Sequence, residues 1–362
     1  KCRLGDYIRI FSGESPNRIN SEYDKIPYYK VEQLNWCEKY LGETPYLSQR
    51  GKNILPEGCV VFSKRGAAIL TNKVRMNLFP INIDTNLMGI KADNSFILDQ
   101  YLFYFILRAR LNRIADTSTI PQINNIHINP ITIYVPSLAE QEIITKFLAL
   151  LDERIATQRR LIEDLEKLMS SIVDRIFSDV DGEVVKFRDI LEISTQRNDG
   201  KADYRILSAS QEFGMIERDS LDIDIKAEAK SVKMYKRVHP GDYVLHLRSF
   251  QGGLAFAEVE GICSPAYTIL RPNKRLEYGY LKEYFNSSKF IKSLVLVTYG
   301  IRDGRSINVE EFLDMNISIH HKNKQAEIVK SLSMLSDKLN VEASILNRYE
   351  QQRAYLLSNL FI

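Results

Sequence analysis

Two long stretches without proline or glycine, residues 137–181 and 322–362, constrain the fold of this chain more than any other feature of its sequence. In each stretch, apolar side chains recur at alternating spacings of four and three residues, which is the 3.5-residue period of a coiled-coil seam. The second stripe reproduces the first at an offset of 184 residues, and the polar interruption Gln158 returns as Glu342. Core helices rarely keep heptads for so long. We therefore predict two long helices that pack on each other; the alternative is two amphipathic helices that pack only on their own domains.

The predicted seam uses matching apolar positions of the two helices. These positions are Ile144, Leu148, Leu151, Ile155, Ile162 and Leu165 in the first helix, and Ile328, Leu332, Leu335, Leu339, Leu346 and Leu356 in the second. Because an internal duplication relates the helices, they should meet about a pseudo-two-fold axis, which makes them antiparallel. A helix of about 35 residues spans about 50 Å. The pair would therefore hold two globular copies a fixed distance apart.

The rest of the chain is duplicated as well. The matching segments, at offsets of 183 or 184 residues, are Leu4–Ile10 with Phe187–Ile193, Glu57–Val61 with Pro240–Val244, Ile123-Asn124 with Ile307-Asn308, and Gln141 with Gln325. Short β-rich runs after glycine-containing turns predict strand-rich domains, with single helices over 98–109 and 278–290. The predicted fold is a duplicated α/β (α+β) architecture, with two mixed, strand-rich domains separated by two long antiparallel coiled-coil helices. The predicted segments are 1–134 (first domain), 135–180 (first helix), 181–318 (second domain) and 319–362 (second helix).

Charge and composition narrow the class of protein. The net charge is only +3, but residues 1–134 carry 17 Lys and Arg against 12 Asp and Glu, so the first domain can hold a basic face. The apolar runs are short, as in residues 101–107, which predicts no membrane-spanning helix. The four cysteines are scattered without a CxxC pair, which favours a reducing, cytoplasmic setting and argues against a cysteine-rich zinc site.

The sequence lacks the motifs of the enzymes that act on DNA. The string closest to an amino-methyltransferase motif of the form Asn/Asp-Pro-Pro-Tyr/Phe is Asn129-Pro130-Ile131-Thr132, which fails at two positions, and there is no P-loop. The five histidines lack metal-ligand spacing. Asp222, Asp224, Glu228 and Lys230 form a superficially nuclease-like cluster, which we interpret as a solvated acidic loop. We predict no catalytic residue and no metal site.

Several segments resemble the specificity subunits of type I restriction-modification systems. These segments are Pro136–Ile144, Leu151–Ile155, the Gly-Asp turns at 5–6 and 241–242, and Tyr299–Ile307. The resemblance covers the whole chain in the order domain, helix, domain, helix. The proline and the Glu-Gln pair that open the first helix are its most specific part. The second copy departs from this pattern, because His320-His321 replaces the proline segment and only Gln325 remains.

The resemblance implies a division of labour. Each domain would be a target recognition domain that reads one half of a bipartite, non-palindromic site in double-stranded DNA, and the helices would set the gap between the halves. Two methyltransferase subunits would dock on the chain, bind S-adenosylmethionine and methylate adenine. An ATP-dependent motor nuclease, with its Mg²⁺, is an optional further subunit. This chain itself would bind no cofactor.

Base reading requires Arg, Lys, Asn or Gln on loops that can enter the major groove. Our candidates are Lys64, Arg65 and Arg75 in the first copy, and Arg248, Gln251, Arg302 and Arg305 in the second. Neighbouring glycines allow the backbone to approach DNA closely. Two rival functions stay open: a scaffold that spaces two protein-binding domains without DNA, and a nuclease that uses the acidic cluster at Asp222.

Overall fold

The chain forms two compact units, residues 1–159 with 345–362 and residues 160–344. The computed structural model describes residues 1–15, 20, 25–49, 51–117, 120–178, 180–200, 204–210, 213–218, 232–246, 249–299 and 306–361. Each unit contains one strand-rich domain and a part of both long helices, α3 (Leu138–Ile176) and α9 (Lys322–Asn359). The predicted domain boundaries at residues 134, 180 and 318 stay a prediction.

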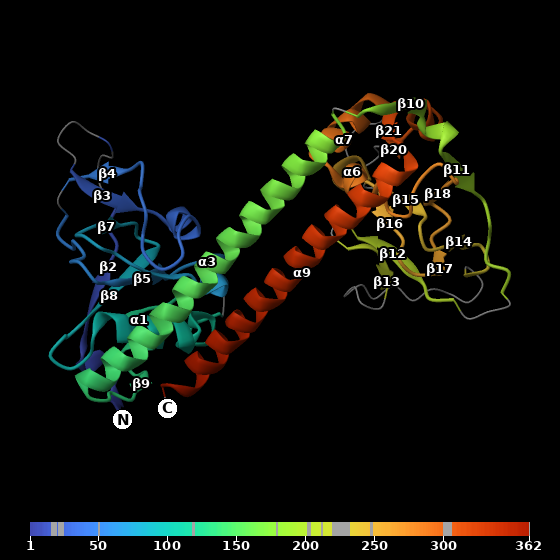
Figure 1. Ribbon diagram of the computed structural model, residues 1–362. Helices are drawn as coiled ribbons and strands as arrows, with labels where there is room; N and C mark the ends of the chain where they lie inside the picture. Colours follow the sequence, from blue (N-terminus) through green and yellow to red (C-terminus); the bar gives the residue numbers. More distant parts are fainter. Residues whose placement is uncertain are drawn as a thin grey trace. The chain divides into compact units, whose positions relative to one another are not determined.

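The first unit is built on an antiparallel four-stranded sheet (Figure 1). Its strands, in spatial order, are β2 (Ile8–Ser12), β8 (Leu87–Ala92), β5 (Val60–Ser63) and β6 (Val74–Met76). The central strand β5 is fully buried because successive side chains point to opposite faces and both faces are covered. Val60 and Phe62 pack with α1 (Asp99–Ala109), whereas Val61 packs into a second core with β3 (Ile26–Tyr29) and β7 (Asn82–Ile83). β4 (Leu47–Ser48) pairs with β3.

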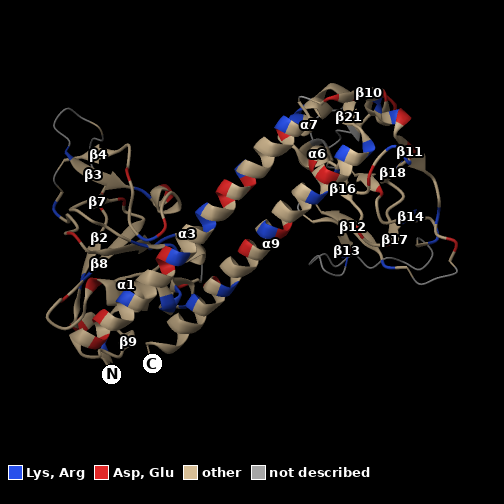
Figure 2. Cartoon of the chain, in the orientation of Figure 1, with Lys and Arg blue, Asp and Glu red and all other residues tan. Residues whose placement is uncertain are grey.

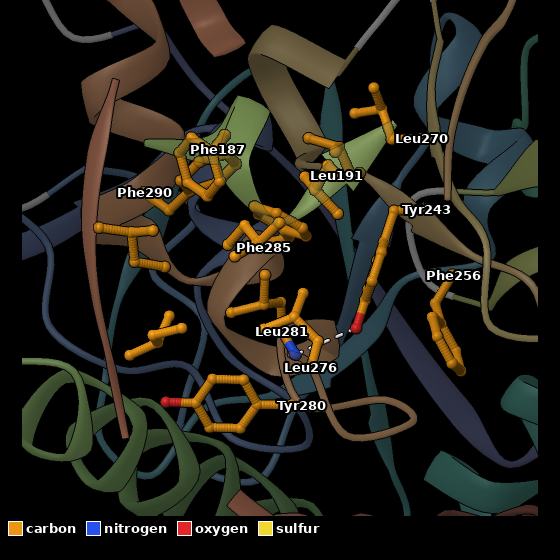
Figure 3. Close-up of a cluster of buried hydrophobic side chains, with 14 of the residues drawn as sticks. Phe187, Leu191, Tyr243, Phe256, Leu270, Leu276, Tyr280, Leu281, Phe285 and Phe290 are labelled. Atoms are coloured by element: carbon orange, nitrogen blue, oxygen red, sulfur yellow. Dashed lines mark hydrogen bonds between the residues drawn. The ribbon is translucent and has the colours of Figure 1, made fainter. Parts of the chain in front are cut away.

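The second unit repeats this topology. Its sheet has the order β11 (Leu191–Ser194), β18 (Thr268–Pro272), β15 (Tyr243–Leu245) and β16 (Ala255–Phe256). Figure 3 shows Tyr243 in the main core of this unit, where its hydroxyl accepts a hydrogen bond from the Leu281 amide at 3.0 Å. Val244 packs into a separate core on the other face. The alternation of Tyr243 and Val244 therefore reproduces that of Val60 and Val61, which confirms the predicted duplication at the level of the fold.

Smaller elements complete both units. In the first unit these are β1 (Cys2–Arg3), β9 (Thr132–Ile133) and α2 (Asn125–Ile128). In the second they are β10 (Gly182–Lys186), β12 (Leu207–Ser210), β13 (Gly214–Glu217), β14 (Lys236–Val238), α5 (Ser249–Gly252), β17 (Gly261–Cys263), β19 (Thr298–Tyr299), β20 (Ser306–Ile307), α8 (Val309–Leu313) and β21 (Asn316–His320). The antiparallel pairs β1–β9 and β10–β21 are equivalent, and each leads into a long helix.

One predicted helix is wrong. The segment 278–290 is not a single helix: it contains α6 (Lys282–Asn286) and the start of α7 (Ser288–Ser293). The break is at Ser287, whose backbone is extended and whose Oγ accepts a hydrogen bond from the Phe290 amide. A serine that caps the next helix competes with continuation of the preceding one, and helical spacing of apolar residues does not detect this.

The two long helices pack antiparallel on each other within both units. In the first unit, Arg353 Nε donates to Asp152 Oδ1 at 2.5 Å, and the Arg159 guanidinium donates to Glu350 Oε1 at 2.6 Å. The α9 partner number therefore falls as the α3 number rises. In the second unit, Met169 of α3 shares an apolar core with Ile328 of α9. The predicted antiparallel pair is confirmed, and the helices pack on the domains as well as on each other.

All twelve predicted seam positions are buried or half-buried. Leu148, Leu151 and Ile155 are at most 6% exposed in the first helix, as are Ile328 and Leu332 in the second. Among the described residues, no helix has an apolar stretch long enough to cross a bilayer.

A buried glutamine fixes the start of α3 to the first domain. Gln141 is fully buried; its Oε1 accepts from the Leu98 amide at 2.8 Å, and its Nε2 donates to the carbonyls of Phe96 and Pro136 at 2.8 and 3.0 Å. One side chain thus satisfies three backbone groups from two segments. The Glu-Gln pair in the sequence therefore marks a junction between helix and domain.

The second copy repeats this junction. Gln325 is 1% exposed; its Oε1 accepts from the Glu277 amide at 2.8 Å, and its Nε2 donates to the carbonyls of Arg275 and His320 at 3.1 and 2.8 Å. The glutamine survives where the proline of the first copy is lost, because its three hydrogen bonds do not depend on that proline.

Replacement of Gln141 by glutamate should lower the free energy of unfolding by about 2–4 kcal/mol, because a carboxylate cannot donate to two buried carbonyls. The matched control is Gln351→Glu, since Gln351 lies exposed on α9. Urea denaturation measures both changes, and hydrogen exchange at the Leu98 amide reports the junction directly. Equal midpoints for the two variants would show that this junction contributes nothing to stability.

Candidate nucleic-acid interface

In the first unit, the connection between β5 and β6 (residues 64–73) has a fixed backbone. The Lys64 amide donates to the Asn86 carbonyl and the Lys64 carbonyl accepts from the Ile123 amide, both at 2.8 Å. Gly66, with φ of +84°, donates to the Pro121 carbonyl at 2.8 Å. The Arg65 side chain is exposed and that of Lys64 is half-buried. This loop therefore presents two cations from a rigid backbone.

Two segments without any Asp or Glu, residues 58–83 and 100–115, meet at this end of the unit. Asn72, with φ of +48°, joins them: its Nδ2 donates to the Leu107 carbonyl and its Oδ1 accepts from the Leu111 amide, both at 2.9 Å. Their seven cations, the first basic surface, are Lys64, Arg65, Lys73, Arg75, Arg108, Arg110 and Arg113 (Lys and Arg are blue in Figure 2). Within the described part of the chain, none of the seven forms an ion pair with a carboxylate.

The predicted residues of the first copy differ in their surroundings. Lys64 and Arg65 belong to the β5–β6 loop, whereas Arg75 is half-buried and donates to the carbonyls of Leu34 and Val74 at 3.1 and 2.9 Å. Sequence reasoning missed four members of the first basic surface. These are Lys73, Arg108, Arg110 and Arg113. The signal that could have found them is the lack of acidic residues from both segments.

In the second unit, the equivalent connection runs from β15 to β16. Gln251 is exposed there on α5, whereas Arg248, Arg302 and Arg305 lie outside the described residues. The α5 turn is held by a hydrogen bond from the His246 amide to Ser249 Oγ at 2.9 Å. Gly253, with φ of +80°, passes so close to the Phe285 carbonyl that a Cβ would lie 2.1 Å from that oxygen. Because α5 lies against β20, Gln251 is near the strand that directly follows residues 300–305.

The acidic cluster of Asp222, Asp224, Glu228 and Lys230 also lies outside the described residues. Over the part of the chain that the structure describes, no group of three or more His, Cys, Asp or Glu side chains could hold a metal ion.

Comparison with known families gives this geometry a context. A family model described as "Type I restriction modification DNA specificity domain" matches residues 1–167. Residues 1–167 belong to this family of DNA specificity domains. They comprise the first domain, with its basic surface, and most of α3. The matched family is a specificity domain and not a catalytic one.

Known relatives extend the likeness. The putative type I restriction enzyme MjaX specificity subunit of Methanocaldococcus jannaschii is 22% identical over 176 residues, which cover 48% of this chain and 40% of that relative. The match thus spans less than half of that relative's length. The type I restriction-modification S subunit of M. genitalium has the same fold at a TM-score of 0.57 and 14% identity, over 99% of this chain and 95% of that one.

A second structure, from work on complex assembly and conformational transition of the type I R-M system, gives a TM-score of 0.61 at 16% identity, over 98% of this chain and 95% of that one. Because both structural matches cover nearly the whole chain, the specificity-subunit fold includes both units. The predicted fold class and the family resemblance are confirmed.

Proposed function

We propose that this chain is the non-catalytic DNA-specificity subunit of a type I restriction-modification complex. It reads a bipartite, non-palindromic site in double-stranded DNA with its two domains, at a spacing set by α3 and α9. The observation that carries the proposal is the position of the predicted base-reading residues. Lys64 and Arg65 in one domain, and Gln251 in the other, occupy the same connection of one repeated sheet topology.

The charge distribution supports DNA as the ligand of the first domain. Seven cations from two segments without acidic residues provide contacts to phosphates, which position a protein on a duplex. Lys64 and Arg65, on a loop with a fixed backbone, are suited to base edges in the major groove. The equivalent loops differ in sequence, Lys-Arg-Gly against Arg-Ser-Phe-Gln-Gly, so the two half-sites should differ.

An exposed apolar stripe on both long helices supports the docking of partner subunits. Its members are Ile143, Phe147, Leu150, Leu161 and Leu168 on α3, and Met334, Val341 and Tyr355 on α9, each at least 40% exposed. Each lies one residue before a position of the heptad seam, and is therefore rotated about 100° around the helix from it. Both helices thus offer a second apolar face at equivalent positions.

We assign this second face to two methyltransferase subunits. These subunits would bind S-adenosylmethionine and methylate the target base, and an ATP- and Mg²⁺-dependent motor nuclease would be a further partner in systems that have one. The rival scaffold function would also use such a stripe, but it gives no reason for the first basic surface.

The test is the double variant Lys64→Gln/Arg65→Gln, assayed in the complex with its methyltransferase subunits. Methylation-sensitive sequencing of the host should show that methylation is lost, or relaxed at one half-site, while the other half-site keeps its sequence. Affinity for the site should fall about a hundredfold, at 1–3 kcal/mol per base contact. The control Arg154→Gln/Arg160→Gln removes two exposed α3 cations and should leave half-site sequence unchanged. An unaltered methylation pattern in the folded double variant would refute the assignment of this loop.

The same variants separate the reader from the scaffold. A reader binds DNA with a steep dependence on salt, whereas a scaffold shows no such dependence. The chain has a single tryptophan, Trp36, which is 60% exposed in the first unit, so its fluorescence provides a label-free readout of DNA binding.

A further inference from the structure

The first unit contains a cavity of about 480 Å³ where its domain meets α3 and α9. Three segments of the domain line it, namely residues 38–39, β6 with Asn72, and the end of α1. The charged residues of its wall are Glu38, Lys39, Arg75, Arg108, Arg110, Asp152, Arg159, Glu350 and Arg353. Six cations thus face three carboxylates, and the wall carries an excess of positive charge.

The three carboxylates are already engaged. Glu38 and Glu350 both accept hydrogen bonds from Arg159, at 2.5 and 2.6 Å. Asp152 accepts from Arg353 at 2.5 Å and from the Tyr104 hydroxyl at 2.7 Å. The positive charge of the other four cations in the wall is therefore uncompensated. These are Lys39, Arg75, Arg108 and Arg110, which have no carboxylate within ion-pair distance among the described residues.

Lys39 shows what this imbalance does to a buried group. Its Nζ donates to the Tyr104 hydroxyl at 2.9 Å and lies 5.2 Å from the centre of the Phe103 ring. Burial lowers the pKa of Lys39 to about 8; the nearby Asp152 partly opposes the shift, and Arg353 adds to it. An anion in the cavity would favour the protonated amine, because an opposite charge stabilises the charged form.

The second copy shows that the fold does not need these charges. At the offset of 184 residues, Asp152, Arg159 and Arg353 correspond to Ser336, Ala343 and Met169. Met169 is 8% exposed and packs in the apolar core of the second unit. One copy thus builds this junction with apolar and small residues and the other with ions, so the ionic set of the first unit has a purpose other than folding.

Two of the free arginines are positioned by the backbone. Arg110 has φ of +53° at the end of α1, and Arg108 lies in the last turn of that helix. A helix C-terminus stabilises cations, which explains how the fold tolerates them without carboxylates. The hydrogen bonds of Asn72 to Leu107 and Leu111 hold this turn in place.

We propose that this cavity binds a phosphate group, through the guanidinium groups of Arg108, Arg110 and Arg75 with Lys39 as an additional cation. Guanidinium groups match phosphate because their N–H donors form a planar fork that binds two oxygens at once. The phosphate can belong to a DNA backbone or to a free phosphate or nucleotide. The DNA case rests on the proposed function, whereas the phosphate site itself does not.

The test titrates the whole chain with inorganic phosphate at constant ionic strength, with chloride as the reference anion, by calorimetry and by the thermal midpoint. Phosphate should bind saturably and raise the midpoint, since a ligand that binds only the folded state stabilises it. At pH 8, binding should be accompanied by proton uptake, measurable in buffers of different ionisation enthalpy, and Lys39→Met should abolish that uptake.

The variant Arg108→Gln/Arg110→Asn should weaken phosphate binding about tenfold or more, at 1.5–3 kcal/mol for a charged hydrogen bond. Asparagine is chosen because it tolerates the positive φ at position 110. Arg108→Gln alone should lie between this variant and the parent, and the control Arg154→Gln/Arg160→Gln should bind as the parent does. The absence of saturable phosphate binding, or equal affinity in the double variant and the parent, would overturn the proposal.

Competition with a short DNA duplex identifies the source of the phosphate. If the site holds the DNA backbone, the double variant should lose DNA affinity, its salt slope should fall by about two, and phosphate should compete with the duplex. If the site holds a free phosphate or nucleotide, DNA affinity should not change while phosphate affinity falls. The Lys64/Arg65 experiment is independent of both outcomes, so failure of one proposal is distinguishable from failure of the other.

Discussion

Replacement of Leu151 by aspartate is expected to lower the free energy of unfolding by several kcal/mol. Leu151 is 6% exposed within the helix pair. The substitution removes a buried leucine, which costs about 2–5 kcal/mol, and adds the penalty of a carboxylate without a partner. The thermal midpoint and DNA affinity should fall together, because the helix pair belongs to both compact units.

The matched control is Leu150→Asp, one residue earlier on the same helix. Leu150 is 52% exposed, so the same change should alter stability by no more than about 0.5 kcal/mol. Because Leu150 belongs to the exposed stripe, this variant should still weaken binding of the methyltransferase subunits. If the two variants have equal thermal midpoints, the seam is misassigned.

Removal of one heptad from each long helix should shorten the gap between the two half-sites by about three base pairs. The structure suggests the segments Arg160–Glu166 and Lys338–Ser344, because their removal leaves the helix residues of the first unit in place and takes out both members of the Lys338–Glu342 ion pair. Seven residues correspond to about 10 Å of helix, or about three base pairs at 3.4 Å each. Each half-site should keep its sequence, since no recognition loop is altered.

The complementary variant duplicates the same two segments and should lengthen the gap by about three base pairs. Methylation of a DNA library with variable spacers, by the complex with its methyltransferase subunits, measures both changes. Removal of the heptad from α3 alone should instead displace the seam and lower stability. An unchanged gap in a folded double-deletion variant would mean that the helices do not set the spacing.

The elements that the sequence predicted well are those with a local repeat. The helix pair could be predicted from residues such as Ile144 and Leu148, because the heptad period is a property of neighbouring turns of one helix. Gln141 and Gln325 could be matched by their offset alone, although their three hydrogen bonds each appear only in the folded chain. The helix expected over 278–290 was wrong because a local cap at Ser287 outweighed its apolar spacing.

The candidate site was predicted only in part. Lys64 and Arg65 stood out because they follow a buried strand and precede a glycine, all within a few residues. Arg108 and Arg110 did not, because they lie more than thirty residues from Arg75 in the sequence and meet it only in the folded first unit. Asn72 brings these segments together through hydrogen bonds to the backbone around the end of α1.

The sequence by itself determined the duplication, the length and phase of the helices, and the absence of enzyme motifs, since these depend on residue type and spacing along the chain. Only the tertiary structure decided which cations are neutralised. The carboxylates of Asp152 and Glu350 engage Arg353 and Arg159 across the helix pair, while Arg108 and Arg110 have no such partner. Electrostatic compensation acts through space over a few ångströms, and the sequence does not record which charges the fold brings that close.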